Sequence, residues 1–270
     1  MTRRREFAGR WRSAAALLSI ALAMPAATMS LAAEGDTAAM PPPAQDWVFE
    51  GPFGSFDRAA LQRGYQVYRE VCAACHAMEF IAFRNLSQPG GPEFSEEAVE
   101  ALAAEFIITD GPDEYGDMFE RPGKPSDYFP SPYRNDNEAR AANGGALPPD
   151  LSIIAKARPN GSNYLHALLT GYEDPPADFD LGFGLYYNPY FSGRQIAMAP
   201  PLFEGIVEFA DGTEASVDQM SRDVASFLKW TAEPKLEERK ALAKPVLIYL
   251  VLLTILLYMS YKRIWRDVDH

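Results

Sequence analysis

The spacing of apolar residues along the chain predicts four helices. Apolar side chains recur every three or four positions over 56–71, 95–106 and 216–231, and a further helix is expected over 161–172. Gly64 lies in the first helix, where the absence of a side chain would let a second helix approach closely. The 216–231 helix is the natural partner, so we expect the first and last helices of the domain to cross.

Loops are expected to fill most of the space between these helices. Residues 111–150 are rich in Pro, Gly, Asn and Asp, and 173–202 has the same loop-like character. Strand signal is limited to a possible hairpin near 206–209, ahead of an Asp211-Gly212 turn. The pattern predicts one mainly α domain with long loops, over residues 34–244.

The most apolar segment, 245–261, contains no charged residue. As a helix it would rise about 26 Å, slightly less than the roughly 30 Å hydrocarbon core of a bilayer. Lys244 can extend its amine to the interface, and Lys262, Arg263 and Arg266 follow the segment directly. We expect one transmembrane helix over 245–261 and a cytoplasmic tail over 262–270. A buried core helix is the alternative.

The N-terminus has the features of a secretory signal peptide. A basic start precedes an apolar stretch from Ala14 to Met24, and small residues follow up to Ala33. The apolar stretch of about eleven residues is too short to cross a bilayer easily. We expect a signal peptide over 1–33, with cleavage near Ala26-Ala27 as the alternative. The domain would then lie in the bacterial periplasm, held at the inner membrane by its C-terminal helix.

Residues 34–244 are strongly acidic. They contain 17 Lys and Arg against 34 Asp and Glu, a net charge near −17. This charge argues against nucleic acid as a partner and favours a basic soluble protein. A solvated face that aids solubility explains the acids equally well. The acids cluster at Glu93, Glu96, Glu97, Glu100 and Glu105, and again at Asp110, Asp113, Glu114 and Asp117.

A five-residue motif, Cys72-Ala73-Ala74-Cys75-His76, follows the first predicted helix. Two thiols at this spacing can form thioether bonds to the two vinyl groups of one haem, and the next residue places an imidazole under the iron. A thioredoxin-like pair would need no histidine, and a zinc site would need four ligands, whereas Cys72 and Cys75 are the only cysteines. The motif predicts one covalently attached haem c, a carrier of single electrons.

A sixth iron ligand must come from elsewhere in the chain, or the iron is open to chemistry. Six of the nine methionines leave with the signal peptide or lie in segments expected to be core, entry segment or membrane helix, and Met78 is too close to His76 to reach the opposite face of the haem. Met118 and Met198 remain. Met198 is favoured because it precedes Ala199-Pro200-Pro201, a stiff extended run that could hold a thioether in place. His166 is the alternative, although a lone histidine on a helix more often packs or faces solvent.

Several longer segments occur in a specific order. They are FDRAALQRGYQVYREVCAACHAM at 56–78, ARAANGGALPPDLS at 139–152, LLTGYEDPP at 168–176, GLYYNPYFSGRQIAMAPPL at 184–202 and DGTEASVDQMSRDVASFLKWTAEP at 211–234. With the C-terminal anchor, this series resembles the cytochrome c1 family, the haem subunits of quinol–cytochrome c oxidoreductase (cytochrome bc1) complexes. The resemblance implies a cytochrome c-like haem domain with long loops and one transmembrane helix.

The resemblance also implies roles for single residues. Cys72 and Cys75 would be the thioether attachments, His76 the proximal iron ligand and Met198 the distal one. No further cysteine is present for the disulfide that some bacterial members carry in an insertion.

Further residues would surround the haem. Pro148 and Pro149 would line its histidine side, where a backbone carbonyl can accept the N–H of the ligating imidazole. Arg158 and Tyr164 would meet the haem propionates, with Asn143 as a weaker candidate. A solvated arginine and a core tyrosine are the simpler interpretations of that pair.

The function that the resemblance implies is electron transfer, with no bond made or broken by this chain, which would not be an enzyme by itself. It would take electrons from a Rieske iron–sulfur protein and pass them to a soluble, basic cytochrome c. Quinol oxidation would belong to a cytochrome b subunit, against which the 245–261 helix would pack. Two other functions stay open: a donor cytochrome of another respiratory complex such as a terminal oxidase, and an open-site haem enzyme such as a peroxidase.

Overall fold

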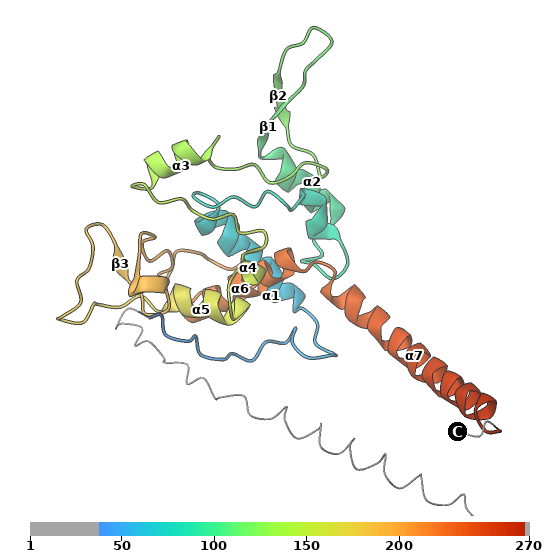
Figure 1. The fold of residues 1–270 in the computed structure, drawn as a ribbon. Coiled ribbons are helices and arrows are strands. Elements are labelled where there is room, and N and C mark those ends of the chain that lie inside the picture. The colour runs from blue at the N-terminus through green and yellow to red at the C-terminus, as the bar shows by residue number, and fades with distance from the viewer. Residues whose placement is uncertain (1–37, 268–270) are drawn as a thin grey trace, which may run out of the picture. The chain divides into compact units, whose positions relative to one another are not determined.

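Helices dominate the computed structural model, which describes residues 38–267 (Figure 1). The predicted signal peptide lies outside the described residues. The helices are α1 (Arg58–Val67), α2 (Glu96–Ala104), α3 (Asp136–Ala142), α4 (Ile154–Ala157), α5 (Gly161–Thr170), α6 (Val217–Ala232) and α7 (Leu236–Ile264). Two short antiparallel hairpins complete the elements, β1 (Ile107–Asp110) with β2 (Phe119–Pro122) and β3 (Tyr186–Tyr187) with β4 (Gln195–Ile196). The predicted mainly α architecture is confirmed.

The crossing of α1 and α6 forms the centre of the domain. Asp57 caps α1 by accepting the backbone N–H of Ala59 at 2.9 Å, so the helix begins at Arg58 rather than at the predicted 56. At Gly64 a Cβ atom would lie 2.1 Å from the carbonyl oxygen of Asp223 on α6. Only glycine permits this approach, as the sequence predicted.

Aromatic rings fill the space around this crossing. The rings of Tyr65 and Tyr68 on α1 and the following turn both contact Phe227 on α6 and Phe129 from a loop. Phe227 in turn contacts Trp230, which is almost fully buried. Burying each such side chain stabilises the fold by roughly 1.5–3 kcal/mol. The core therefore sits directly behind the end of α1, where the Cys-x-x-Cys-His motif begins.

The expected hairpin at 206–209 is not formed. Val207 and Phe209 are buried, and the backbone of Glu208 accepts a side-chain hydrogen bond from Gln66 on α1 rather than pairing with a strand. The turn itself is present, because the N–H of Gly212 donates to the carbonyl of Phe209 at 3.1 Å. The segment is an extended strip packed on the helices.

The loop-rich 111–150 segment also contains more structure than predicted. β1 pairs with β2 to form a projecting hairpin, and α3 adds a short helix. The side chain of Asn135 caps α3 by accepting the N–H of Glu138. These elements are short, so their apolar periodicity was too brief to be recognised in the sequence.

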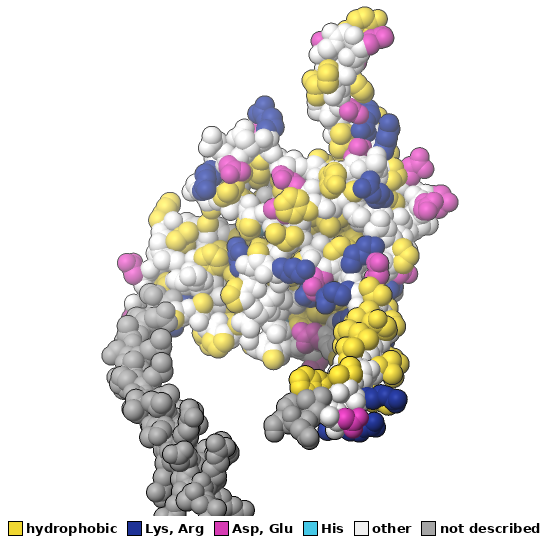
Figure 2. All heavy atoms as spheres, turned by 45° about the vertical axis from the view of Figure 1, so that its right-hand side comes forward, with side chains coloured by type: hydrophobic (Ala, Val, Ile, Leu, Met, Phe, Trp, Pro, Cys, Tyr) yellow, Lys and Arg dark blue, Asp and Glu magenta, His cyan; other side chains and the backbone are white. Residues whose placement is uncertain are grey.

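The C-terminal helix, α7, is long enough and apolar enough to cross a membrane. Its 29 residues continue through Pro245, so the helix begins nine residues before the predicted transmembrane segment. The helix leaves the rest of the chain as a single rod (Figure 1), and Figure 2 shows hydrophobic side chains along it and basic ones at its far end. Leu236 at its start packs in the domain core, and most of its later apolar side chains are exposed, as expected for a surface that lipid or another subunit covers.

Candidate functional site

The helical winding changes between the end of α1 and the Cys-x-x-Cys-His motif. Residues Tyr68–Cys72 form a π-helical turn, a wider winding that is common at functional sites. The backbone then turns tightly, with the N–H groups of Cys75 and His76 both donating to the carbonyl of Cys72. Cys72 and Cys75 are half-buried and form no disulfide. Both thiols are thus left for chemistry on one short turn.

The imidazole of His76 is oriented by the loop that contains the two predicted prolines. Its Nδ1 lies 2.8 Å from the carbonyl oxygen of Pro149. In the neutral ring with the proton on Nδ1, this atom donates to the carbonyl, and Nε2 keeps its lone pair. Burial lowers the pKa of His76 and so favours this neutral form, although the Pro149 carbonyl and the Asp150 carboxylate oppose the shift. The geometry is that of a histidine prepared to bind a metal.

Asp150 and Ser152 hold this loop against the chain that follows the motif. The Asp150 carboxylate accepts the N–H of Glu79 at 2.8 Å and that of Ser152 at 2.7 Å. The Ser152 hydroxyl accepts the N–H of Phe80 at 3.1 Å. Sequence reasoning missed both residues. The Asp-x-Ser spacing after the two prolines could have indicated this turn, because an Asp carboxylate often accepts a hydrogen bond from the backbone N–H two residues later.

Met198 is half-buried and attached to the end of α5. Its backbone carbonyl accepts a hydrogen bond from the hydroxyl of Tyr172 at 3.0 Å. Burial raises the pKa of Tyr172, so its hydroxyl stays protonated and able to donate. Tyr172 follows Gly171, where a Cβ would clash with the ring of Tyr190 at 2.5 Å. Glycine at this position lets the Met198 loop lie directly on the helix end.

Asn188 makes the deepest connection between this loop and α5. It is fully buried, and its Nδ2 donates to the carbonyl of Leu168 at 2.8 Å. Its Oδ1 accepts the N–H of Tyr190, and its own N–H donates to the carbonyl of Arg194. Neither Tyr172 nor Asn188 was predicted, since a long-range hydrogen bond leaves no local pattern in sequence.

The rival ligands occupy other environments. Met118 is 61% exposed in the loop between β1 and β2. The Nε2 of His166 lies 2.9 Å from the carboxylate of Asp218, and the His166 ring packs edge-on against Trp47. His166 is thus buried and hydrogen-bonded within the packed domain, and Met118 lies in an exposed loop, so both differ in environment from the half-buried Met198.

The predicted propionate-binding pair lies together. Burial raises the pKa of Tyr164. The guanidinium of Arg158, which lies within hydrogen-bonding range of Tyr164, opposes this shift. Burial is the main cause of the raised pKa of Tyr172, and Tyr164 adds to it. Asn143 is engaged elsewhere, because its Nδ2 donates to the hydroxyl of Tyr133 and the carbonyl of Ala139. It caps α3 and need not contact a cofactor.

The donor set fits a covalently attached haem. Two unpaired thiols, an imidazole with one nitrogen already engaged and a thioether on a supported loop are the groups that a Met/His-ligated haem c uses. Within residues 38–267, no cluster of three or more His, Cys, Asp or Glu side chains is arranged to hold a metal ion. A zinc site is therefore unsupported in the described part of the chain.

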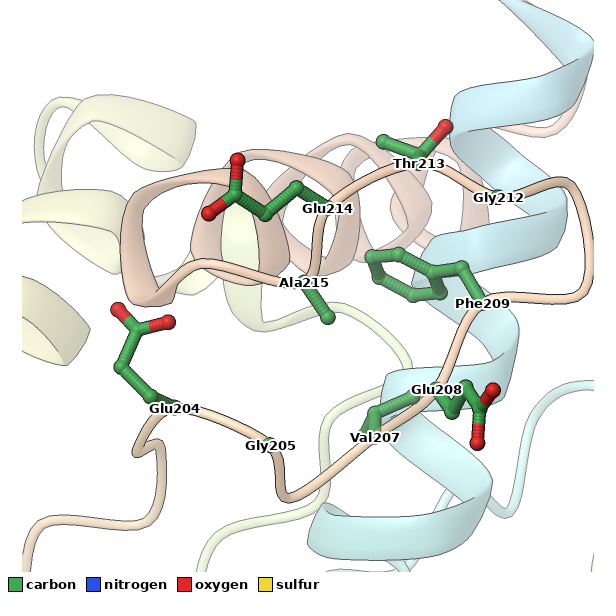
Figure 3. Close-up of a pocket in the computed structure, with 9 residues that line it drawn as sticks. All are labelled: Glu204, Gly205, Val207, Glu208, Phe209, Gly212, Thr213, Glu214 and Ala215. Atoms are coloured by element: carbon green, nitrogen blue, oxygen red, sulfur yellow. The ribbon is translucent and has the colours of Figure 1, made fainter.

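Two surface pockets lie outside this group of residues. One, of about 310 Å³, is an open pocket lined by nine residues between 204 and 215, among them Glu204, Glu208 and Glu214 (Figure 3). The carboxylates in Figure 3 are separated around the pocket rather than gathered on one point. The other, of about 250 Å³, is lined by Tyr65, Tyr68 and surrounding residues. Neither pocket is lined by any of the predicted site residues.

Comparison with known proteins gives the family. The model of the Cytochrome C1 family matches residues 47–268. The chain belongs to the cytochrome c1 family. The match begins ahead of α1 and extends through α7, so it includes the motif, the Met198 loop and the long C-terminal helix.

Curated relatives agree with this cytochrome c1 assignment. Cytochrome c1 of Rhodospirillum rubrum is 48% identical, with 84% of this chain and 88% of that protein aligned. The mitochondrial cytochrome c1 heme protein of Saccharomyces cerevisiae is 51% identical, with 88% and 78% aligned. The cytochrome b/c1 of Bradyrhizobium diazoefficiens is 49% identical over 84% of this chain, which spans only 36% of that longer protein.

Proposed function

We propose that this chain is a membrane-anchored cytochrome with one haem c, bound through Cys72 and Cys75 and ligated by His76 and Met198. Membership of the cytochrome c1 family supports the cofactor, as does the name heme protein carried by mitochondrial relatives. The observation that carries the proposal is the 2.8 Å contact between His76 Nδ1 and the Pro149 carbonyl, next to two unpaired thiols. A ring nitrogen held by a backbone carbonyl leaves the other nitrogen of the same imidazole available as a ligand.

The bound haem would supply an iron that exchanges single electrons. The residues around it would do the rest. His76 would hold one axial position with its ring fixed by Pro149, and Met198 would hold the other on a loop fixed by Tyr172. Arg158 and Tyr164 would present donors to the carboxylates of the cofactor. Two filled axial positions leave no site for a substrate, so the chain would carry electrons rather than catalyse a reaction.

The electron donor would be a Rieske iron–sulfur protein and the acceptor a soluble, basic cytochrome c. The family to which the chain belongs supports a place in a quinol–cytochrome c reductase complex. The relative named cytochrome b/c1 supports a cytochrome b partner, since one polypeptide carries both names. The strongly acidic haem domain supports a basic acceptor. Cytochrome b would also offer a surface for α7.

The proposed topology places the haem domain in the periplasm. The basic residues Lys262, Arg263 and Arg266 follow the apolar part of α7, which favours a cytoplasmic C-terminus. The signal peptide expected over 1–33 would direct the domain across the inner membrane.

Purification of the full-length protein from membranes in mild detergent tests this function. We expect a covalent haem that resists acid–acetone extraction, a low-spin spectrum, and copurifying b-type haems with an iron–sulfur protein. Copurification with a copper–haem oxidase would instead support a donor cytochrome of another respiratory complex. A high-spin spectrum would indicate an open iron site and would refute the proposed ligation.

A further inference from the structure

The loop of residues 47–55, called here the juxtamembrane loop, is attached to the first turns of α7. The ammonium of Lys240 donates to the backbone carbonyls of Phe49 at 2.7 Å and Gly54 at 2.9 Å. The ammonium of Lys244 lies 4.9 Å from the centre of the Phe53 ring. The loop is thus bound at two successive turns of the helix that enters the membrane.

The juxtamembrane loop is closed and ordered by its own contacts. The N–H of Ser55 donates to the carbonyl of Val48, and a Cβ on Gly54 would lie 1.9 Å from the carbonyl oxygen of Glu50. Trp47 and Phe49 point inward, where their rings stack at 5.3 Å. Val48, which lies between these two residues, and Phe53 further along the loop are exposed instead.

The chain that follows the loop is fixed to α7 as well. The carboxylate of Glu237 accepts the N–H of Phe56 at 2.7 Å and pairs with the guanidinium of Arg58 through two further hydrogen bonds. The N-terminus of α1 and the start of α7 therefore hold the loop between them. It cannot swing away from the helix without breaking these contacts.

Two of the outward side chains of this loop are large and apolar. Phe53 is 80% exposed and Val48 is 66% exposed. Glu50 is the exposed acid of the loop, while Lys240 and Lys244 supply two positive charges beside it. Single exposed apolar residues are normal on a protein surface. Their attachment to a membrane-crossing helix is what makes this pair unusual.

The position of the membrane boundary gives the depth of Phe53. The uncharged stretch of α7 begins at Pro245, directly after Lys244. With about 1.5 Å of rise per residue, its 17 residues nearly match the roughly 30 Å hydrocarbon core, so the boundary must lie close to Lys244. The Phe53 ring, in contact with the Lys244 ammonium, lies at the same depth. This is the zone where aromatic side chains and lysines face lipid headgroups.

We propose that the juxtamembrane loop is a second membrane contact, with Phe53 inserted between the headgroups and the upper acyl chains of the surrounding lipid. One helix alone would leave the domain free to tilt about its exit point. A second contact beside the helix would fix the orientation of the domain over the bilayer. The proposal depends on α7 spanning the membrane and is independent of the haem and its ligands.

Photolabelling of the full-length protein in lipid nanodiscs tests the proposal. The probe is phosphatidylcholine with a diazirine group near the top of the acyl chain, and the adducts are mapped by peptide mass spectrometry. Phe183 provides the internal control, because it is fully exposed on a loop of the same domain and has no recorded contact with α7. Phe53→Asp and Phe183→Asp are the matched variants, and both replace an exposed ring.

We expect adducts on 48–54 and on the apolar part of α7, but not around Phe183. Phe53→Asp should remove the loop adducts while those on α7 persist, and Phe183→Asp should change nothing. Adducts on α7 without any on the loop would overturn the proposal, as would equal labelling around Phe183. Loop adducts that disappear in the purified membrane complex would show that a protein subunit covers Phe53, which would also overturn it.

Discussion

The hydroxyl of Tyr172 donates a hydrogen bond to the backbone carbonyl of Met198 across 3.0 Å. Tyr172 stands just beyond the end of α5, whereas Met198 lies 26 residues further along the chain in a loop without regular structure. The bond therefore connects the proposed distal ligand to a helix that packs on α6 in the domain core. A ligand held in this way loses little entropy when it binds iron, because its backbone is already in place.

Replacing Met198 with leucine tests the ligand itself. The change removes the thioether while keeping the side-chain volume nearly constant. Covalent haem should remain, and the reduction potential should fall by roughly hundreds of millivolts, within the range over which axial ligands set haem potentials. The measurement is a redox titration followed in the visible spectrum. An unchanged potential with an intact methionine–iron charge-transfer band would exclude Met198.

Replacing Tyr172 with phenylalanine tests the support of that ligand. The ring is kept and one neutral hydrogen bond is lost, so methionine ligation should weaken by about 1 kcal/mol, or roughly fivefold. Imidazole titration of the ferric protein should therefore displace the methionine at lower concentration. Tyr115→Phe is the matched control, since Tyr115 is 82% exposed in the loop between β1 and β2 and its hydroxyl has no recorded bond to Met198. Identical titrations for both variants would mean that the bond does not position the ligand.

Sequence patterns predicted the parts of the fold that depend on local spacing. The helix before the motif, the crossing at Gly64 and the long C-terminal helix follow from apolar periodicity, a missing side chain and a run of uncharged residues. The 206–209 hairpin was predicted wrongly because a turn signal such as Asp211-Gly212 indicates a hairpin only when a strand is present on each side of it. Here the neighbouring partner is the side chain of Gln66 on a helix.

The candidate site could be predicted in part for the same reason. The Cys-x-x-Cys-His motif is contiguous, so its chemistry can be read from five residues. The residues that orient the ligands are remote, such as Asn188 reaching back to Leu168 and Asp150 reaching back to Glu79. These contacts depend on how loops close over the core, which no local pattern encodes. The haem ligands themselves stay a prediction until the cofactor is measured.

A stop codon after Lys244 should release a folded, soluble haem domain. The truncated chain keeps Glu237 and Lys240, and with them the contacts that close the base of the domain. The removed part of α7 carries no proposed ligand. We expect an unchanged haem spectrum in the periplasmic fraction. A truncated protein with altered ligation would show that the anchor contributes more than attachment to the membrane.

Acid stability should depend on Asp127. The guanidinium of Arg121 lowers the pKa of this carboxyl to about 2, with further hydrogen bonding from the N–H of Lys124. An unfolded Asp has a pKa near 3.9, so the stabilisation is complete above about pH 4 and is lost as the pH falls towards about 2. Asp127→Asn should lower stability at pH 7 and flatten its decline in that range.

Denaturant unfolding at several pH values measures this effect. Asp178→Asn, at an exposed carboxylate with no recorded ion pair, is the control and should follow the unchanged protein. If the free energy of unfolding of the Asp127 variant falls between pH 4 and pH 2 in parallel with that of the unchanged protein, the lowered pKa of Asp127 does not contribute to acid stability.

The exposed carboxylates of α2 are the best candidates for steering a basic acceptor. Glu96, Glu97 and Glu100 are exposed and have no ion pair recorded among the described residues, whereas Glu105 pairs with Arg69 and Asp110 with Arg121. Unpaired charges contribute their full field to a partner, so these three should attract a cationic protein most strongly. Reversing them to lysine should slow association and flatten its salt dependence, because the Debye length falls from about 30 Å at 0.01 M to about 10 Å at 0.1 M.

Stopped-flow reduction of a basic cytochrome c at several ionic strengths measures this steering. The matched control reverses Asp174, Asp178 and Asp180, which changes the net charge equally at another exposed segment. If docking takes place at α2, the α2 variant should lose much more of the on-rate than the control, and both should keep the haem potential nearly unchanged. Equal losses would mean that net charge alone steers the partner. If the α2 variant instead keeps the rates and salt dependence of the unchanged protein, the α2 carboxylates form a solvated face that does not dock the partner. The search would then move to Asp110–Asp117.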